Sequence, residues 1–364
     1  MTKSSTKNRI IFIDLMRAFA VLMMVQGHTT DVFLSGAFRN PESSVFAVWN
    51  FMRGMTAPIF LFTAGNVFTY LFKLQDKPFT ANPRFKKGIK RFLLLVFLGY
   101  MLRYPTAKVI DFWDIPPERW NIFFAVDVLQ LIGFGILFLI GCIYLSEKYD
   151  WNIYLILSLV SALFIGLNPV FANIHWINFM PHPLAAYFSN ELGSNFPLFP
   201  WVAYVLAGGI LGNYLAKYPT VFKTSSFSLK LGVFGAALIL IALLGNTFET
   251  WIFGQSYFWS VSPNLVFLRI GIVLILNAVV SLISIKMESI PRIIILIGRN
   301  TLLIYIVHLI LLYGCAWSVG LDQFLGRTFN VWQTIGAVII MLFLMVGMVE
   351  LIHKFKIRNK ELVT

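Results

Sequence analysis

The chain has 364 residues, of which 58% are hydrophobic and 12% charged, and its mean hydropathy is +0.78. These values exclude a soluble globular protein and indicate one that crosses a membrane many times. The formal net charge of +13 comes from cations in short segments between apolar runs, and the absence of an aromatic and basic face excludes nucleic acid as a partner.

Apolar runs of about 17 to 25 residues predict an all-α, polytopic membrane bundle of about ten helices. In chain order they lie near 10–34, 45–72, 89–104, 121–145, 151–171, 197–216, 228–246, 264–285, 291–317 and 331–354. The segments before the first run, after the second and sixth, and after the last are basic, which places them and both termini on the cytoplasmic side. Because no repeat or polar linker divides the chain, we expect one integral-membrane domain over residues 1–364.

Three ionisable side chains share one face of the first predicted helix. Asp14 stands three residues before Arg17, and His28 follows eleven residues later, which returns to nearly the same azimuth at about 100° per residue. Arg17 and His28 are then about 16 Å apart along the axis. Such groups mark a functional site by default, although an Asp14–Arg17 ion pair with His28 at the interface is the alternative. An arginine suits an anionic cosubstrate, and a histidine can accept a proton from an acceptor.

Polar residues also occur in the later predicted helices. Arg53 and Gly54 interrupt the second helix, which favours non-helical backbone beside a cavity. His308, in the ninth, is either a core histidine or a second proton acceptor. Further candidates to line a substrate site or pore are one acid and three amides, namely Asn66, Asp127, Gln130 and Asn300. Such amides more often join helices, whereas a buried acid needs a partner.

Two further histidines and the cysteines carry less information. His175 and His182, in the loop after the fifth helix, are expected at the surface or at an entrance for the acceptor. Cys142 and Cys315 lie inside apolar runs, so we expect neither a disulfide framework nor a metal site.

The arginine, ten residues and then the histidine of the first helix resemble the signature of integral-membrane acyltransferases that O-acetylate polysaccharides. Five stretches resemble more closely the heparan-α-glucosaminide N-acetyltransferase catalytic domain family, in a bacterial-type member. In chain order they are IDLMRAFAVLMMV, APIFLFTAGN, VDVLQLIG, FPLFPWVAYVLAGGILG and GRNTLLIYIVHLILL. The resemblance implies an acyltransferase that takes acetyl groups from cytosolic acetyl-CoA, as cosubstrate, and transfers them to a sugar or glycan on the other side of the membrane.

On this resemblance, His28 is the candidate catalytic residue, with Arg17, Asp14 and His308 as further candidates. The loop SGAFRNPESS departs from the family, because the lysosomal enzymes of the group are thought to use a histidine there and this chain has none. Direct transfer and an acetyl-histidine intermediate therefore both stay open, as do N- and O-acylation, the acyl chain length and the identity of the acceptor.

The cations of RFKKGIKR resemble in position the basic pair that holds CoA phosphates in the polysaccharide acetyltransferases. Lys87, Lys90 and Arg91 are the nearest match, and Arg17 and Arg299 could add further cations. The alternative is that the segment serves only as a topology signal.

We expect an integral protein of a bacterial inner (plasma) membrane, in contact with membrane lipids and compatible with a homo-oligomer. A function of another class is the alternative, namely a secondary transporter of a small anionic solute with Asp14, Arg17 and Asp127 at its coupling or substrate site. Transporters of that kind usually have inverted repeats and paired broken helices, and the sequence shows no repeat.

Overall fold

The computed structural model describes residues 10–109, 111–287 and 290–361. The first nine residues, whose cations entered the prediction of orientation, lie outside this range. The chain divides into two compact units. We call Leu61–Lys286 the central unit, and Ile10–Phe60 together with Met287–Thr364 the terminal unit. The single domain expected over residues 1–364 stays a prediction.

The all-α, polytopic architecture is confirmed. Within the described ranges, eight helices are long and apolar enough to cross a membrane, or nine if one bent pair counts as a single span. The predicted span near 89–104 is helical as part of α4 (Pro83–Leu102), but the cations in its first half leave no sufficiently apolar window. The chain is therefore an integral membrane protein, and the cytoplasmic location of both termini stays a prediction.

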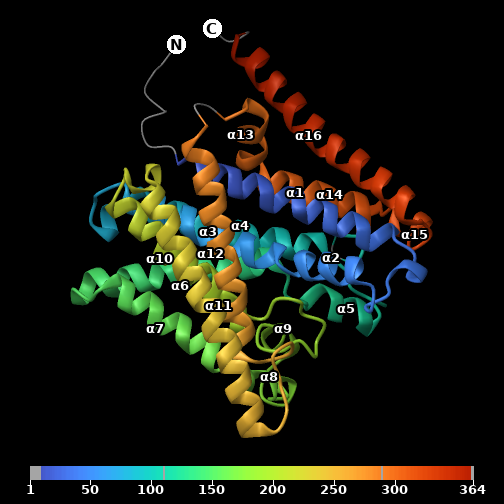
Figure 1. Ribbon diagram of the computed structural model, residues 1–364. Helices are drawn as coiled ribbons and strands as arrows, with labels where there is room; N and C mark the ends of the chain where they lie inside the picture. The colour runs from blue at the N-terminus through green and yellow to red at the C-terminus, as the bar shows by residue number, and fades with distance from the viewer. Residues whose placement is uncertain (1–9, 110, 288–289, 362–364) are drawn as a thin grey trace. The chain divides into compact units, whose positions relative to one another are not determined.

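In the terminal unit, α1 lies beside α13, α14 and α16 (Figure 1). The elements of this unit are α1 (Ile11–Phe33), η1 (Gly36–Phe38), α2 (Ser44–Gly54), the start of α3 (Thr56–Lys73), α13 (Arg292–Arg299), α14 (Thr301–Tyr313), β1 (Gly314–Cys315), β2 (Ser318–Val319), α15 (Asp322–Leu325) and α16 (Val331–Glu361). The two short strands form an antiparallel pair directly after α14. Apolar side chains along α1, such as Met16 and Val21, are fully buried.

Two predicted spans of the terminal unit differ from a single straight helix. In the second, α2 ends at Gly54 and α3 begins at Thr56, but Met55 between them keeps right-handed helical backbone angles and Ser44–Lys73 remains one candidate span, so the predicted non-helical backbone is not found there. The ninth span was expected as one helix over 291–317, but α13 and α14 meet at an angle of 73° and α14 ends at Tyr313. Gly298 and the following Arg299–Asn300 stand at the bend, where a glycine and an amide that bonds the backbone weaken the helix.

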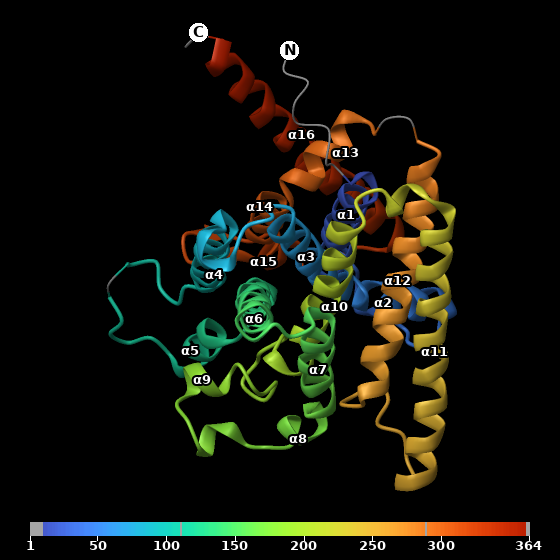
Figure 2. The ribbon, with the colours of Figure 1, turned by 90° about the vertical axis from the view of Figure 1, so that its left-hand side faces the viewer.

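The central unit contains the remaining helices, with α11 and α12 paired along their length (Figure 2). Its elements are most of α3, η2 (Phe79–Ala81), α4, α5 (Pro117–Phe124), α6 (Val128–Tyr149), α7 (Ile153–Gly166), α8 (Asn168–Ala172), η3 (Trp176–Asn178), α9 (His182–Ala185), α10 (Leu198–Lys217), η4 (Val221–Lys223), α11 (Ser225–Phe253) and α12 (Pro263–Ile285). The fourth predicted span, expected without interruption over 121–145, is broken between α5 and α6.

Small residues allow α3 and α10 to approach closely. A Cβ atom at Gly208 would collide with the backbone of Phe62, and one at Gly212 would collide with the backbone of Asn66. On the other helix, a Cβ atom at Gly65 would collide with the backbone of Val205. Close packing of this kind through small residues is typical of membrane helices.

Candidate functional site

Two histidines from opposite ends of the chain lie next to each other in the terminal unit. His28 of α1 and His308 of α14 have ring centroids 5.5 Å apart. The Nδ1 atom of His28 is 3.2 Å from the hydroxyl oxygen of Tyr313. The Tyr305 ring packs against His308 at 5.7 Å between centroids. We call His28, His308 and Tyr313 the histidine cluster.

The surroundings of His308 determine where its proton lies. Its side chain is fully buried, and its Nδ1 atom is 2.8 Å from the backbone oxygen of Ile304. Because a carbonyl oxygen can only accept, Nδ1 carries the proton, and in the neutral ring the Nε2 atom has an available lone pair. Nε2 has no hydrogen-bond partner among the described residues. His308 thus presents a buried basic nitrogen beside His28.

At the other end of the same two helices, Arg17 approaches the start of α14. An Arg17 nitrogen is 3.4 Å from the Thr301 hydroxyl, to which it donates. Asp14 is buried on α1, and a Cβ atom at Gly298 would lie only 2.9 Å from its backbone oxygen. The lack of a side chain at Gly298 therefore brings the bend between α13 and α14 against the polar start of α1.

Arg299 and Asn300 form this bend. The Asn300 side chain donates to the backbone oxygen of Leu296 at 2.8 Å, which is a local role at the end of α13. Arg299 is exposed, and it stands at the end of α13 rather than at the start of a continuous ninth helix. Along α1, the bend and the histidine cluster are separated by the interval of about 16 Å expected between Arg17 and His28.

An ion cluster that the sequence reasoning missed follows His28 by one turn. Asp31 pairs with Arg53 of α2 and with Arg39, whose nearest nitrogen is 3.6 Å from the carboxylate. A Cβ atom at Gly27 would be 3.4 Å from the Arg53 side chain, so the glycine makes room for it. Asp31 stands three residues after His28 on the same helix, and this spacing was the signal that could have revealed it.

Asp127 and Gln130, in the central unit, have structural partners. Asp127 precedes α6 as its N-cap, and Gln130 completes a capping box by accepting from the Asp127 backbone N–H at 3.2 Å. The Asp127 carboxylate also pairs with Arg103 at 2.8 Å, which joins the end of α4 to the start of α6. Asp127 therefore lies just before α6, outside the helices into which the structure divides the predicted span over 121–145. A pore-lining role for either residue stays a prediction.

Asn66 lies on α3 in the central unit and is buried where that helix meets α10. Its side-chain oxygen has no hydrogen-bond partner in the described part of the chain. The loop histidines differ from each other. His175 is exposed, as expected, and pairs with Glu191 at 3.0 Å. His182 is half-buried beside Phe124, and burial lowers the pKa of its imidazole.

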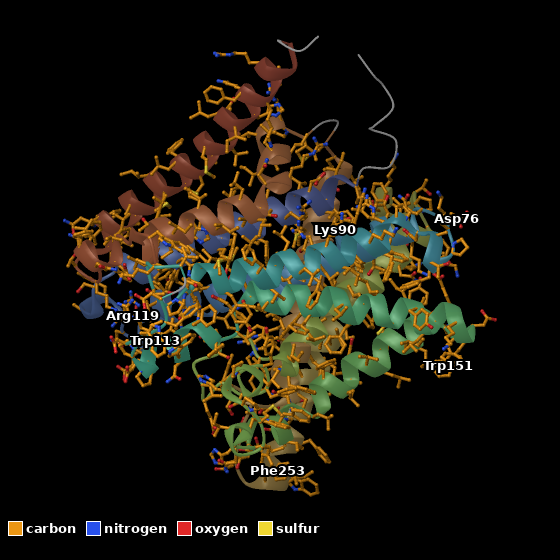
Figure 3. The ribbon with its side chains drawn as sticks, turned by 180° about the vertical axis from the view of Figure 1, so that it is seen from behind. Asp76, Lys90, Trp113, Arg119, Trp151 and Phe253 are labelled. Atoms are coloured by element: carbon orange, nitrogen blue, oxygen red, sulfur yellow. The ribbon has the colours of Figure 1, made fainter. Side chains whose placement is uncertain are left out.

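The cations expected to hold CoA phosphates lie on α4. Lys87, Lys90 and Arg91 are exposed, and Lys90 projects from the helix in Figure 3. They belong to the central unit, whereas Arg17 and Arg299 belong to the terminal unit.

The terminal unit thus combines two chemical elements along α1 and α14. One end offers a guanidinium and a hydroxyl that can bind an anion, and the other offers two imidazoles and a phenol that can move a proton. Within the described ranges, no three His, Cys, Asp or Glu side chains are grouped to hold a metal ion. The absence of a metal from the chemistry stays a prediction.

Comparison with known proteins identifies a family. The model of the family described as heparan-alpha-glucosaminide N-acetyltransferase, catalytic, matches residues 9–255. This range contains α1 to α11, with Arg17 and His28, and ends before α14 with His308. Among the curated proteins, none matches the chain.

Proposed function

The chain belongs to the heparan-alpha-glucosaminide N-acetyltransferase catalytic family, and from that membership we propose that it transfers an acetyl group from cytosolic acetyl-CoA to a sugar or glycan on the opposite side of the membrane. Membership makes it a membrane acyltransferase. The observation that carries the finer proposal is the histidine cluster at one end of the α1–α14 pair, with Arg17 at the other. We further propose that the membrane is a bacterial inner membrane.

In the proposed reaction, an imidazole Nε2 removes the proton from an acceptor hydroxyl or amine. The acceptor then attacks the thioester carbonyl carbon, an ester or amide bond forms, and the carbon–sulfur bond breaks. The CoA sulfur leaves as a thiolate and takes up a proton. We assign the first step to His28, because it is only partly buried and its Nδ1 atom faces the Tyr313 hydroxyl. If Nδ1 donates to that oxygen, Nε2 is the base.

We assign the donor to the end of α1 near Asp14. Arg17 is the cation that binds the donor there, and the nearby Thr301 hydroxyl and the bend after Gly298 shape its surroundings. Lys87, Lys90 and Arg91 are proposed to hold the phosphates of CoA, with Arg299 as a further cation. The transferred group, the acceptor and the choice between direct and acetyl-histidine transfer are parts of the proposal, and we favour direct transfer.

Substituting the two histidines separately tests this assignment. His28→Ala should lower the rate of acetyl transfer to a glycan panel by about 10² or more, the scale on which a general base contributes. The thermal stabilisation of the purified protein by CoA should persist, because the cations that bind CoA lie elsewhere. His308→Asn can keep a donor to the Ile304 oxygen and removes the basic nitrogen.

Controls separate the two imidazoles from general effects. His353→Ala changes a histidine on α16 outside the cluster and should leave transfer unchanged. Normal turnover of His28→Ala together with an inactive His308→Asn would show that the general base is His308 on α14 and not His28. Incubation with radiolabelled acetyl-CoA and no acceptor should leave the protein unlabelled, since covalent label is expected only from an acetyl-histidine intermediate.

A secondary transporter of a small anionic solute is the second candidate. The observation that favours it is the 73° bend between α13 and α14 beside Arg17, because broken helices line transport sites. Saturating CoA distinguishes the two functions. A ligand at 100 times its dissociation constant stabilises the folded protein by about 2.7 kcal/mol. A shift of this size supports the acyltransferase, whereas uptake of an anion by vesicles without any CoA effect supports the transporter.

A further inference from the structure

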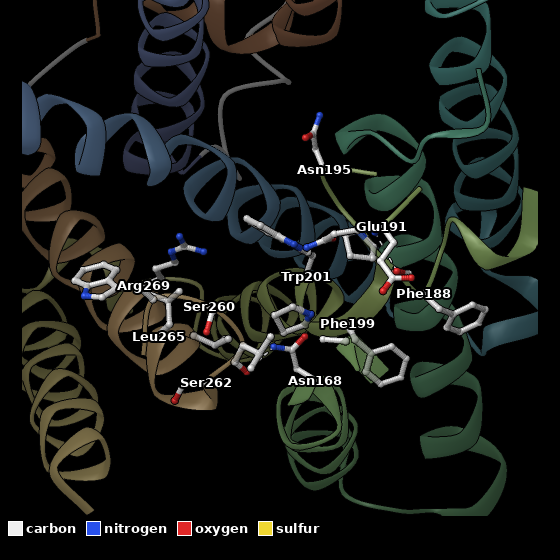
Figure 4. Close-up of a pocket in the computed structure, with 18 residues that line it drawn as sticks. Asn168, Phe188, Glu191, Asn195, Phe199, Trp201, Ser260, Ser262, Leu265 and Arg269 are labelled. Atoms are coloured by element: carbon white, nitrogen blue, oxygen red, sulfur yellow. Dashed lines mark hydrogen bonds between the residues drawn. The ribbon is translucent and has the colours of Figure 1, made fainter. Parts of the chain in front are cut away.

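A polar cavity in the central unit lies outside the site described above. Its volume is about 320 Å³, within the range of small-molecule sites of about 300–1,000 Å³. It is bounded by α8, the start of α10, the start of α12 and the loops that precede α10 and α12 (Figure 4). All its lining residues belong to the central unit, so the cavity is complete within it.

An arginine that has no acidic partner in the described part of the chain faces this cavity. Arg269 lies on the apolar helix α12, about 9 Å from its first residue Pro263 at 1.5 Å per residue. Its guanidinium lies over the ring of Trp201, 5.6 Å from the centroid. Among the described residues, no acid forms an ion pair with Arg269. A charged residue in a membrane helix is costly unless something neutralises it, and it marks a ligand site by default.

The acids near the cavity are already engaged. Glu191 lines the cavity and pairs with His175 at 3.0 Å. Glu249, at the end of α11, accepts from the Ser262 hydroxyl at 2.5 Å and from the Asn264 amide at 2.9 Å. Neither carboxylate neutralises Arg269, so its positive charge is available to a ligand.

The walls of the cavity combine aromatic rings with amides. Trp201 and the strongly exposed Trp259 provide flat apolar surfaces, and Asn190 and Asn195 provide hydrogen-bonding groups. In the view of Figure 4, Arg269 and Glu191 lie on opposite sides of Trp201. Aromatic faces with nearby polar groups suit a pyranose ring, whose C–H faces are apolar and whose edges carry hydroxyls.

We propose that this cavity binds a sugar unit that carries an anionic group, a carboxylate or a phosphate, with the anion on Arg269 and the ring against the tryptophans. A planar guanidinium binds either anion through two parallel hydrogen bonds. The binding itself is independent of acyl transfer, and only the identification of the bound sugar with the acceptor rests on the proposed function.

Binding of small sugars to the full chain tests the inference. The protein is held in a polyoxyethylene detergent, because glycoside detergents would compete for the cavity. Saturation-transfer NMR then compares methyl glucuronide, glucose 6-phosphate and neutral methyl glucoside. Inorganic phosphate, which has no C–H protons to detect, is tested as a competitor that displaces the anionic sugars. At least one of the two anionic sugars should bind about tenfold or more tightly than the neutral sugar, the scale of one charge-assisted hydrogen bond. The better of the two identifies carboxylate or phosphate as the anion.

Variants localise the effect. Arg269→Gln should abolish the preference for the anionic sugar, and Arg269→Lys should restore part of it. Trp259→Ala should weaken the binding of the anionic and the neutral sugars to the same extent. Lys223→Gln removes an exposed cation of the same unit outside the cavity and should change nothing. The thermal unfolding of each variant shows whether it is folded.

Three results would overturn the inference. They are equal affinity for anionic and neutral sugars, an unchanged preference in a folded Arg269→Gln variant, and inorganic phosphate binding as tightly as either anionic sugar. The proposed function fails separately. If the sugars bind but no acetyl group is transferred, the inference that the cavity binds a sugar is upheld and the proposed acyltransferase function is rejected.

Discussion

The imidazoles of His28 and His308 have different surroundings, and this difference suggests different roles. His308 is fully buried, and its Nδ1 proton is committed to the Ile304 backbone. His28 is only partly buried, and its Nδ1 atom lies beside the hydroxyl of Tyr313, which can donate or accept. An acceptor can therefore reach His28 more readily, while the Ile304 backbone fixes the His308 ring beside it.

Asp14 is expected to orient Arg17 for the donor rather than to transfer a proton. It stands one helical turn from Arg17, at the end of α1 that is remote from His28. Asp14→Asn should weaken CoA binding by about threefold to tenfold, the equivalent of ~0.7–1.4 kcal/mol. Turnover at saturating CoA should change little. Titration of CoA against thermal stability, with parallel rate measurements, checks this. Unchanged binding with a collapse of turnover would assign the carboxylate a chemical role.

Sequence reasoning reached residues on one helix but not their distant neighbours. The 3.6-residue period placed Asp14, Arg17 and His28 on one face of α1. That period contains no information on which helix covers the face, and 285 residues separate His28 from Tyr313. The pairing of the two histidines therefore required the packing of α14 on α1. Asp31 was missed for a simpler reason, since its spacing from His28 was visible but its arginine partners were not.

Among the elements, helix breaks decide where polar groups gather. An apolar run predicts that a helix exists, and the breaks near Met55 and Asn300 show where one run becomes two. The first was predictable because Gly54 weakens a helix. The second break was not predictable, because the sequence GRNT at residues 298–301 is typical of the start of a helix rather than of a bend. Its angle of 73° depends on how α13 packs against α1.

Gly298→Ala tests whether this bend depends on close approach to α1. The added Cβ would lie 2.9 Å from the Asp14 backbone oxygen, closer than packed atoms allow. Overpacking costs about 1–3 kcal/mol, more than the ~1 kcal/mol that alanine gains over glycine in a helix. We expect a lower midpoint of detergent-induced unfolding and weaker CoA binding at the neighbouring Arg17.

Gly336→Ala is the matched control on α16, where a Cβ atom would meet nothing within 4 Å. This substitution should raise stability slightly by reducing the freedom of the unfolded chain, and it should leave CoA binding unchanged. Equal effects of the two alanines would mean that the contact between α13 and α1 does not hold the bend.

The exposed cations of α4 are expected to bind CoA phosphates. Reversing charge at Lys90 and Arg91 together should weaken CoA binding by about tenfold or more, because two favourable phosphate contacts become repulsive. Folding should survive, since both side chains are exposed. Lys223→Glu removes an exposed cation from η4 and should keep CoA affinity. Unchanged affinity in the double variant would leave the α4 cations as a topology signal alone.

At the scale of the whole molecule, the family match and the compact units divide the chain differently. The match ends at residue 255, but the terminal unit unites Ile10–Phe60 with Met287–Thr364. The end of the family match also falls between α11 and α12, whose backbones come close where Gly235 meets Gly271. The segment beyond the match therefore completes packing that the matched segment begins. In membrane proteins, such small-residue contacts allow separately inserted helices to associate.

Dividing the chain between Gln255 and Ser256 tests this dependence, because the cut falls in an exposed loop after α11. Residues 1–255 alone should insert into the membrane but lack acetyl transfer, since His308 and Tyr313 are missing from the histidine cluster. Co-expression with residues 256–364 should restore both copurification and transfer. The second fragment carrying His308→Asn is the matched control, and it should copurify without restoring full activity. Full transfer by residues 1–255 alone would show that α14 is dispensable and that the matched segment contains the complete active site.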